Sequence, residues 1–195
     1  MIKCNSSQDK EKMEKYILEK HNTVLVIVDI QERLVPAMSE KQKVTDNCLH
    51  LIEAAKLLNI PVVVTEQYPK GLGPTISDIK DVIPNYEPLE KVTFDCCRGK
   101  GFLEKMSSMN KRQIVLTGME THVCVLQTCL SLLKEGYTVH LVSNAVCSRK
   151  KEDYLAGREL MRDAGAVVTC TETVLFQLLE KAGTPEFKAI SKRIK

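Results

Sequence analysis

The chain has 195 residues, of which 44% are hydrophobic and 27% charged. This length and balance suit one domain with its own core, and they exclude collagen-like, coiled-coil and disordered chains. Its 28 basic and 25 acidic residues leave a net charge of +3, which makes no strong electrostatic case for nucleic-acid or membrane binding. The most basic stretch, residues 188–195, is interpreted as a solvated tail.

Targeting and membrane segments are not expected. No apolar run reaches the roughly 18 residues that a membrane-spanning helix needs. Residues 1–20 mix lysines with acids, whereas a signal peptide has an apolar region and a mitochondrial presequence is poor in acids. We therefore expect a cytoplasmic protein, in which the eight cysteines, none in a CxxC pair, are mostly buried thiols. The sequence leaves the redox role of Cys96 and Cys97 open.

The first half of the chain alternates apolar runs with loops. A polar lead-in over residues 1–21 precedes a β-branched run at 24–29, which is typical of a strand buried on both faces. Apolar spacing predicts a helix over 46–59 with Thr45 or Asp46 as its N-cap, and Pro61 opens a strand at 62–65. The segment 67–90 is loop-rich with a short helix near 76–82, and 91–94 is a short strand or an extended segment.

The second half repeats this alternation. Buried strands are predicted at 113–118, 138–142 and 166–170, and helices at 123–134, 148–163 and 171–179, with Ser148 capping the second helix. Such alternation predicts right-handed βαβ units. The fold is then a three-layer α/β/α sandwich around a mostly parallel, Rossmann-like sheet of about six strands. The domain spans residues 22–182, followed by a basic C-terminal tail at 183–195.

Ligands of such sheets bind beyond the carboxyl ends of the strands, so residues that follow each strand are candidates for function. Asp29 ends the first strand, where partial burial raises a carboxyl pKa and suits a general base; an N-cap role is equally open. Cys124 starts a helix, whose N–H groups and dipole lower a thiol pKa and stabilise an oxyanion. Taken alone, a small buried core residue is the simpler interpretation of Cys124, and Lys91 alone is uninformative.

Three segments together favour function over these simpler interpretations. VIVDIQ at 26–31, KVTFD at 91–95 and TGMETHVCV at 117–125 resemble the motifs of the isochorismatase-like cysteine hydrolase superfamily. Those motifs are an Asp after the first strand, a Lys near the middle of the chain and a Cys in a G-x-x-T-x-x-C-V turn. The resemblance covers about residues 22–182, and TEQYPKGLGPT at 65–75 is similar to the isochorismatase-domain-containing subgroup that lacks a firmly assigned substrate.

The resemblance implies a catalytic triad. Cys124 would attack an electrophilic carbon such as an amide carbonyl, Asp29 would take its proton and pass it to the leaving group, and Lys91 would orient Asp29 and stabilise negative charge. Hydrolysis of isochorismate itself in this superfamily proceeds without the Cys nucleophile, so Cys124 points to an amidase-like hydrolase with a thioester-type intermediate.

The resemblance also implies a cis peptide bond in the turn Met119-Glu120-Thr121, between its first two residues. That bond would turn backbone N–H groups, with that of Cys124, toward the oxyanion. Nicotinamidases carry an Asp-x-His metal motif after the second strand, but the corresponding stretch here begins Glu66-Gln67 and holds no His. We therefore expect no metal and no other cofactor, and nicotinamide is a doubtful substrate.

The remaining candidates line the substrate pocket by position, although each also has a plain packing or solvent-facing explanation: Gln31, Leu34, Tyr68, Phe94 and His122. We expect a small-molecule substrate and a homodimer or larger homo-oligomer, since oligomers are common in this superfamily. One alternative is a catalytically silent protein that uses the fold as an interaction module. Another is a nucleic-acid enzyme, which we do not expect, because basic residues are not interleaved with aromatic ones and the chain has 4 Phe and 0 Trp.

Overall fold

The computed structural model describes residues 13–194 and contains one six-stranded sheet with the order β3-β2-β1-β4-β5-β6. All neighbouring strands pair in parallel, as the alternation of strands and helices predicts. The strands are β1 (Thr23–Val28), β2 (Val62–Gln67), β3 (Leu89–Lys91), β4 (Gln113–Met119), β5 (Thr138–Cys147) and β6 (Val167–Thr169).

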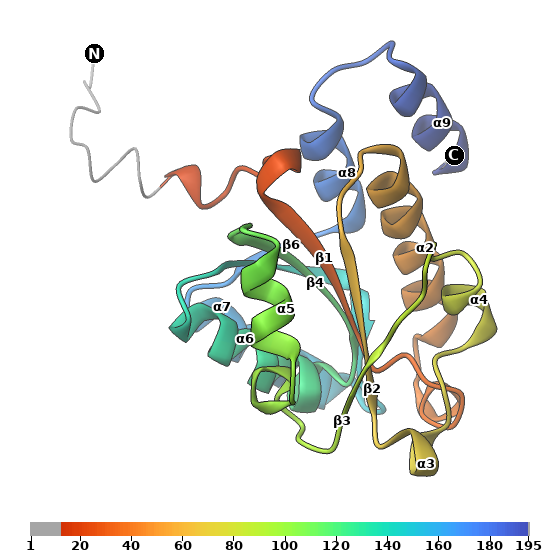
Figure 1. Ribbon diagram of the computed structural model, residues 1–195, viewed down its shortest axis with the longest axis vertical. Coiled ribbons are helices and arrows are strands. Elements are labelled where there is room, and N and C mark those ends of the chain that lie inside the picture. The colour runs from red at the N-terminus through yellow and green to blue at the C-terminus, as the bar shows by residue number, and fades with distance from the viewer. Residues whose placement is uncertain (1–12, 195) are drawn as a thin grey trace.

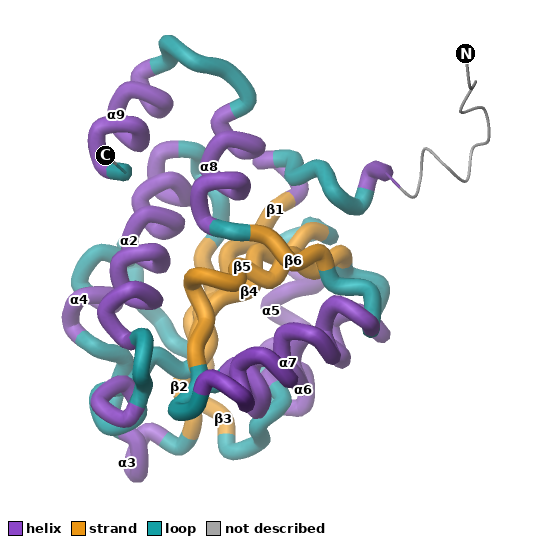
Figure 2. Tube along the Cα trace, turned by 180° about the vertical axis from the view of Figure 1, so that it is seen from behind, coloured by secondary structure: helices purple, strands orange, loops and turns teal. Residues whose placement is uncertain are grey.

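Helices cover both faces of this sheet, which confirms the predicted three-layer α/β/α sandwich (Figure 1). One face carries α2 (Lys41–Leu57), α4 (Ser77–Lys80), α8 (Thr171–Leu179) and α9 (Pro185–Arg193); the other carries α5 (Phe102–Ser108), α6 (Leu126–Lys134) and α7 (Lys151–Asp163). The view from behind shows α2, α8 and α9 on one side of the strands and α7 with α6 on the other (Figure 2). Short segments complete the chain: α3 (Pro69–Leu72), the 3-10 turns η1 (Lys20–Asn22), η2 (Val35–Ala37) and η3 (Cys96–Arg98), and the π-helical η4 (Thr121–Val125).

Strand β1 explains why the sheet needs both helical layers. All six of its residues are buried. Because side chains alternate across a strand, Leu25 and Ile27 join the core under α2 and α8, while Val24 and Val26 join the core under α5 and α6. A strand that is apolar on both faces is stable only between two layers.

Several predicted boundaries are wrong for identifiable reasons. α2 begins at Lys41 and not at residue 46, and its N-cap, Glu40, makes no side-chain capping bond that the sequence could reveal. The N-cap of α7 is Lys150, because Ser148 still belongs to the preceding loop and hydrogen-bonds to His122. β5 runs to Cys147 because it continues to pair with β4 beyond a shift in register.

The C-terminal segment is not the solvated tail that its charge suggests. Residues Pro185–Arg193 form α9, Ile190 is completely buried, and Thr184 caps the helix by accepting from the Phe187 N–H. At the other end, residues 1–12 of the predicted lead-in lie outside the described residues, while the Leu18 N–H donates to Gln177. Within residues 13–194 no helix is both long enough and apolar enough to cross a bilayer.

The carboxyl ends of β1 and β4 come unusually close together. Val28 pairs with Gly118, whose φ is +121°. A Cβ at this glycine would lie 2.1 Å from the Val28 carbonyl oxygen, so no other residue fits without moving the backbone. The strand order reverses between β1 and β4, which is where α/β sheets bind their ligands.

Candidate active site

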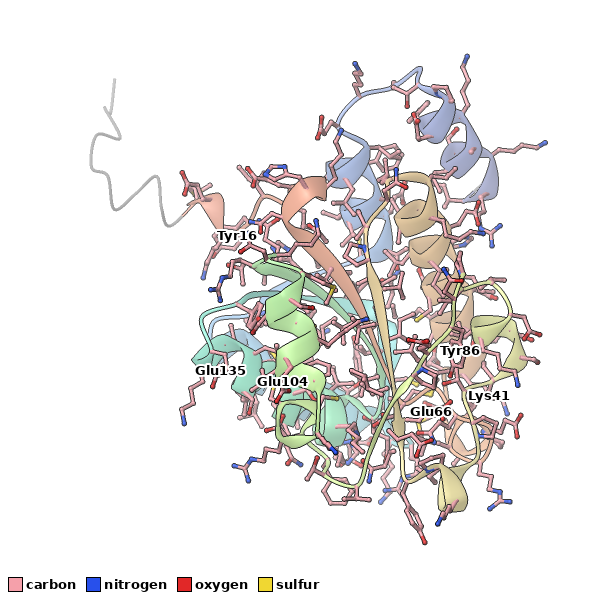
Figure 3. All side chains as sticks on the ribbon, in the orientation of Figure 1. Tyr16, Lys41, Glu66, Tyr86, Glu104 and Glu135 are labelled. Carbon is pink, nitrogen blue, oxygen red and sulfur yellow. The ribbon has the colours of Figure 1, made fainter. Side chains whose placement is uncertain are left out.

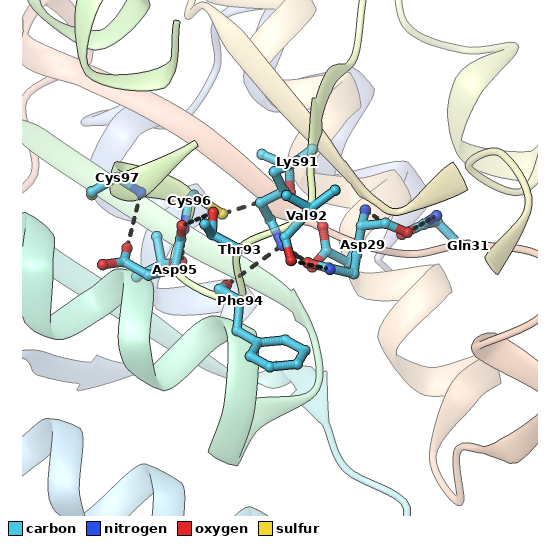
Figure 4. A network of polar contacts seen from close by, with 12 residues as sticks. Asp29, Gln31, Lys91, Val92, Thr93, Phe94, Asp95, Cys96 and Cys97 are labelled. Atoms are coloured by element: carbon cyan, nitrogen blue, oxygen red, sulfur yellow. Dashed lines mark hydrogen bonds and ion pairs between the residues drawn. The ribbon is translucent and has the colours of Figure 1, made fainter. Parts of the chain in front are cut away.

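Asp29 and Lys91 form a buried ion pair at this edge of the sheet (Figure 4). Lys91 Nζ donates to Asp29 Oδ2 at 2.6 Å, and the two side chains are 2% and 0% exposed. The other carboxylate oxygen, Oδ1, accepts from Thr65 Oγ1 at 2.7 Å. Asp29 has a left-handed φ of +53°, which is uncommon for a non-glycine residue. Both oxygens of Asp29 are therefore held in place.

The ammonium group of Lys91 is surrounded by acceptors. It also donates to Gln67 Oε1 at 2.8 Å and approaches the Phe94 carbonyl oxygen at 3.5 Å. Burial alone would lower the pKa of Lys91, but the nearby charges, led by Asp29, more than offset it, so this pKa is raised. Lys91 remains a cation at neutral pH.

Cys124 reaches this group from η4, which follows β4 on the other side of the switch point. Cys124 is 6% exposed, and its side chain lies close enough to Asp29 and Lys91 for both charges to act on the thiol. Burial raises the pKa of the Cys124 thiol, the charge of Asp29 raises it further, and Lys91 lowers it only in part. The pKa is thus shifted in the opposite direction from the lowered value expected for a thiol at a helix start, because burial and the Asp29 carboxylate both raise it. Cys124 is therefore a neutral thiol at neutral pH.

The turn between β4 and Cys124 has an unusual backbone. The peptide bond between Met119 and Glu120 is cis, at the position that the sequence resemblance implied. The Glu120 carbonyl oxygen then accepts from the Val123 and Val125 N–H groups, which is a π-helical register and not the i→i−4 bond that would engage Cys124. Single π-turns of this kind are frequent at functional sites.

Packing and an ion pair hold this turn from outside. On α7, a Cβ at Gly157 would lie 2.8 Å from the His122 Cα, so α7 sits directly on the backbone of η4. The Glu120 carboxylate accepts from the backbone N–H of Arg149 at 3.2 Å and from its Nε at 3.0 Å. The turn is thus held both by close packing against Gly157 and by the ion pair of Glu120 with Arg149.

The five predicted pocket residues differ in burial, from completely buried to more than half exposed. Gln31 is completely buried. Its side-chain amide donates to the Gln67 and Gly73 carbonyl oxygens and accepts from the Gln67 N–H, so it ties the segment after β1 to the segment after β2. Leu34 packs on the core, while Tyr68 and Phe94 are more than half exposed. His122 Nδ1 lies 2.9 Å from Ser148 Oγ and its Nε2 lies 3.9 Å from Asp153.

Three residues that the sequence analysis did not assign to the site contact Asp29 or Lys91 directly or through one neighbour. Thr65 and Gln67 occupy alternate positions at the end of β2, so their side chains share a face with the site. The polar end of this otherwise apolar strand was the available signal. Cys96 is completely buried with its Sγ 3.7 Å from Thr65 Oγ1, and burial raises the pKa of its thiol to about 11.

The stretch where nicotinamidases carry a metal motif has another use here. Glu66 is buried, and its Oε1 accepts from the Thr75 N–H at 2.6 Å and from the Tyr86 hydroxyl at 2.7 Å (Figure 3). In residues 13–194 no three His, Cys, Asp or Glu side chains gather where they could hold a metal ion. The Glu66 carboxylate anchors a loop.

Comparison with known proteins identifies the family of this chain. The family model "Isochorismatase domain" matches residues 23–173. The secreted isochorismatase effector Isc1 of Phytophthora sojae is 41% identical over 90% of this chain and 85% of its own. The structure of the MAR1 ribonuclease from Caenorhabditis elegans is 35% identical with a TM-score of 0.85, covering 91% of this chain and 92% of that one. YcaC from Escherichia coli, an octameric hydrolase of unknown specificity, shares the fold with a TM-score of 0.85 at 23% identity, covering 91% and 90% of the two chains. The chain belongs to the isochorismatase family and has its hydrolase fold.

Proposed function

We propose that this protein is a metal-independent cysteine hydrolase that cleaves a small amide or a related C–N bond. The observation that carries the proposal is the buried ion pair of Asp29 with Lys91, which lies close enough to the Cys124 thiol for both charges to act on it. A nucleophile, a base and a cation gathered in one buried site are the parts that acyl transfer needs. No cofactor is part of the proposal, because these three side chains supply the nucleophile, the proton acceptor and the compensating charge.

The chemistry begins with proton transfer. Because the pKa of the Cys124 thiol is raised, the thiol does not ionise by itself at neutral pH, and Asp29 takes its proton as Sγ attacks the substrate carbon. Lys91 stays charged and balances the negative charge, which alternates between the carboxylate and the substrate oxygen. Asp29 then passes the proton to the leaving nitrogen, the C–N bond breaks, and water hydrolyses the thioester.

The turn is proposed to stabilise the oxyanion. Residues Met119, Glu120 and Thr121 lie between β4 and Cys124, and N–H groups at the start of a helix have no partner within the helix. Such donors act on charge that develops in the transition state. The proposed substrate pocket draws on Tyr68, Phe94 and His122 around this turn, with Gln31 and Leu34 supporting its loops.

Two other functions compete with this proposal. A catalytically silent interaction module would keep the fold without a reactive Cys124. A nucleic-acid enzyme is suggested by the name of the C. elegans relative, and it predicts RNA binding whose affinity falls steeply with salt. We propose that the partner is a small molecule and not RNA, and a salt titration with single-stranded RNA tests this directly.

The assembly and the compartment are also proposals. A homodimer or larger assembly is consistent with the octamer that this fold forms in E. coli YcaC, and light scattering of the purified protein would measure it. All seven cysteines in the described part of the chain are free thiols, which suits a reducing cytoplasm. The P. sojae relative is secreted, so fractionation of the cells that express this chain is the test.

The alkylation rate of each cysteine against pH, read by peptide mass spectrometry, tests the core of the proposal. We expect Cys124 to react fastest of the eight cysteines, and Asp29→Asn to slow it, because the base is removed. Asp95→Asn is the matched control, since Asp95 is also buried but bonds to Cys97 and Ser131. If Cys124 reacts no faster than Cys4 and ignores Asp29→Asn, the silent interaction module becomes the better explanation.

A further inference from the structure

Thr121 carries a buried hydroxyl without a hydrogen-bond partner. The residue is completely buried, and its Oγ1 has no partner among residues 13–194. Buried polar atoms are nearly always hydrogen-bonded, because an unmade bond in the interior is costly. Four side-chain atoms of the described chain share this state, and Thr121 Oγ1 alone among them belongs to the candidate active site.

Neighbouring threonines show that the fold normally satisfies such groups. Thr117 and Thr128 lie on either side of the same turn and are equally buried. Thr117 Oγ1 donates to the Val26 carbonyl oxygen at 3.0 Å, and Thr128 Oγ1 accepts from the Cys96 N–H at 3.0 Å. Thr121 therefore differs from its neighbours in bonding and not in burial.

The backbone around Thr121 is already occupied by other contacts. Gly157 of α7 faces the Thr121 carbonyl oxygen, which would lie 3.0 Å from a Cβ at that glycine. The Val123 and Val125 N–H groups donate to the Glu120 carbonyl, so the hydroxyl does not cap the helix as threonines near helix starts often do. The Thr121 hydroxyl therefore has no partner among residues 13–194, and it lies three residues before Cys124 in the same π-helical turn.

We infer that the Thr121 hydroxyl is a further catalytic group, which donates a hydrogen bond to the substrate oxygen that gains negative charge. The inference deepens the proposed function and rests on it. When Cys124 Sγ bonds to the carbonyl carbon, the π electrons of the carbonyl move onto its oxygen, and the hydroxyl donates to that oxygen. As the intermediate collapses, the C=O bond re-forms and the C–N bond breaks, while the nitrogen takes the proton that Asp29 held. A donor that is used only in the transition state raises kcat and leaves binding unchanged.

Two thiol reagents test this without knowledge of the substrate. Acrylamide adds to a thiol through an enolate, so the electron pair displaced by sulfur moves onto the carbonyl oxygen before the α-carbon is protonated. Iodoacetamide reacts by displacement of iodide, and its carbonyl oxygen gains no charge. The ratio of the two rates at Cys124 therefore reports stabilisation of an oxyanion, separately from thiol ionisation and access.

The variants are Thr121→Val, Thr121→Ser and the matched control Thr128→Val. We expect Thr121→Val to slow acrylamide addition at Cys124 by about tenfold or more and to leave the iodoacetamide rate within about twofold. The loss is smaller than the roughly 10²–10³-fold cost of a lost oxyanion donor in acyl transfer, because the enolate oxygen stands further from sulfur than the oxygen of a tetrahedral intermediate does. Thr121→Ser should restore the ratio, and Thr128→Val should not change it. An unchanged ratio in Thr121→Val, with Cys124 still the fastest cysteine, overturns the role of Thr121 alone. If Cys124 is not the fastest cysteine in the wild type, both this inference and the proposed function fail.

Thermal stability separates a catalytic hydroxyl from a structural one. Thr121→Val removes a hydroxyl that is unpartnered in the free protein, so its Tm should equal or exceed that of the wild type, whereas Thr128→Val should lower the Tm. A lowered Tm in Thr121→Val that Thr121→Ser restores, together with an unchanged rate ratio, would identify a structural bond and overturn the inference.

Discussion

Two carboxylates are buried at neighbouring strand ends, and they differ in what surrounds them. Asp29 follows β1 and accepts from the Lys91 ammonium and the Thr65 hydroxyl, and its charge raises the pKa of the nearby Cys124 thiol. Glu66, in the adjacent strand β2, accepts among residues 13–194 from two neutral donors, the Thr75 N–H and the Tyr86 hydroxyl. Burial is similar for both. The two buried acids therefore differ in their partners and not in their burial, and the proposed function assigns the chemistry to the one that is paired with a cation.

Cys124→Ala should have the largest effect on activity. Removing the nucleophile should lower hydrolysis of any amide substrate by on the order of 10³-fold or more while leaving the fold intact. Cys129→Ala is the matched control, since Cys129 lies five residues further along the chain in α6 and is also buried; it should keep its activity per folded molecule. Steady-state kinetics with circular dichroism measures both, and residual turnover within about tenfold of wild type would rule out the nucleophile.

Lys91→Met tests the ion pair from the cation side. It leaves the Asp29 charge buried without its partner, which should cost about 3–5 kcal/mol of unfolding free energy. The double variant Asp29→Asn with Lys91→Met should recover much of that stability but none of the activity. Urea denaturation at neutral pH measures the stability, and additive losses in the double variant would contradict a direct pair.

His140 extends the comparison to a buried group that has no counter-charge. Burial lowers its pKa from 6.5 to about 4, and its Nε2 has no partner in residues 13–194. Because the folded pKa lies below the unfolded value, the stabilisation is complete above pH 6.5 and is lost as the pH falls through about 4. The unfolding free energy should therefore drop by roughly 3 kcal/mol between pH 7 and pH 4 through this residue. His140→Gln should reduce the drop by that amount, and an unchanged pH profile would contradict it.

Glu66→Gln should have the smallest effect. The amide oxygen can still accept from Thr75 and Tyr86, so the expected loss of unfolding free energy is about 1 kcal/mol. Activity per folded molecule should stay at the wild-type level, since Glu66 is an anchor. A large loss of kcat without a loss of stability would instead place Glu66 in the chemistry.

Much of the architecture follows from local patterns in the sequence. The β-branched run at 24–28 predicts a strand covered on both faces, and the alternation of strands with helices predicts a parallel sheet. Asp29 and Cys124 are identifiable as candidates because they follow strands whose carboxyl ends must share one edge. These features depend on periodicity and on chain connectivity, which the order of residues specifies.

The tertiary structure alone decides the chemical state of the site. Thr65 and Gln67 contact Asp29 and Lys91 across separate strands, and residue order does not specify side-chain partners at such distances along the chain. The raised pKa of Cys124, the role of Gln31 in the loops and the unpartnered hydroxyl of Thr121 each depend on burial by several elements at once. The sequence by itself therefore determines which residues reach the carboxyl edge of the sheet. Packing decides which of them meet, because desolvation and hydrogen bonding are properties of the assembled core.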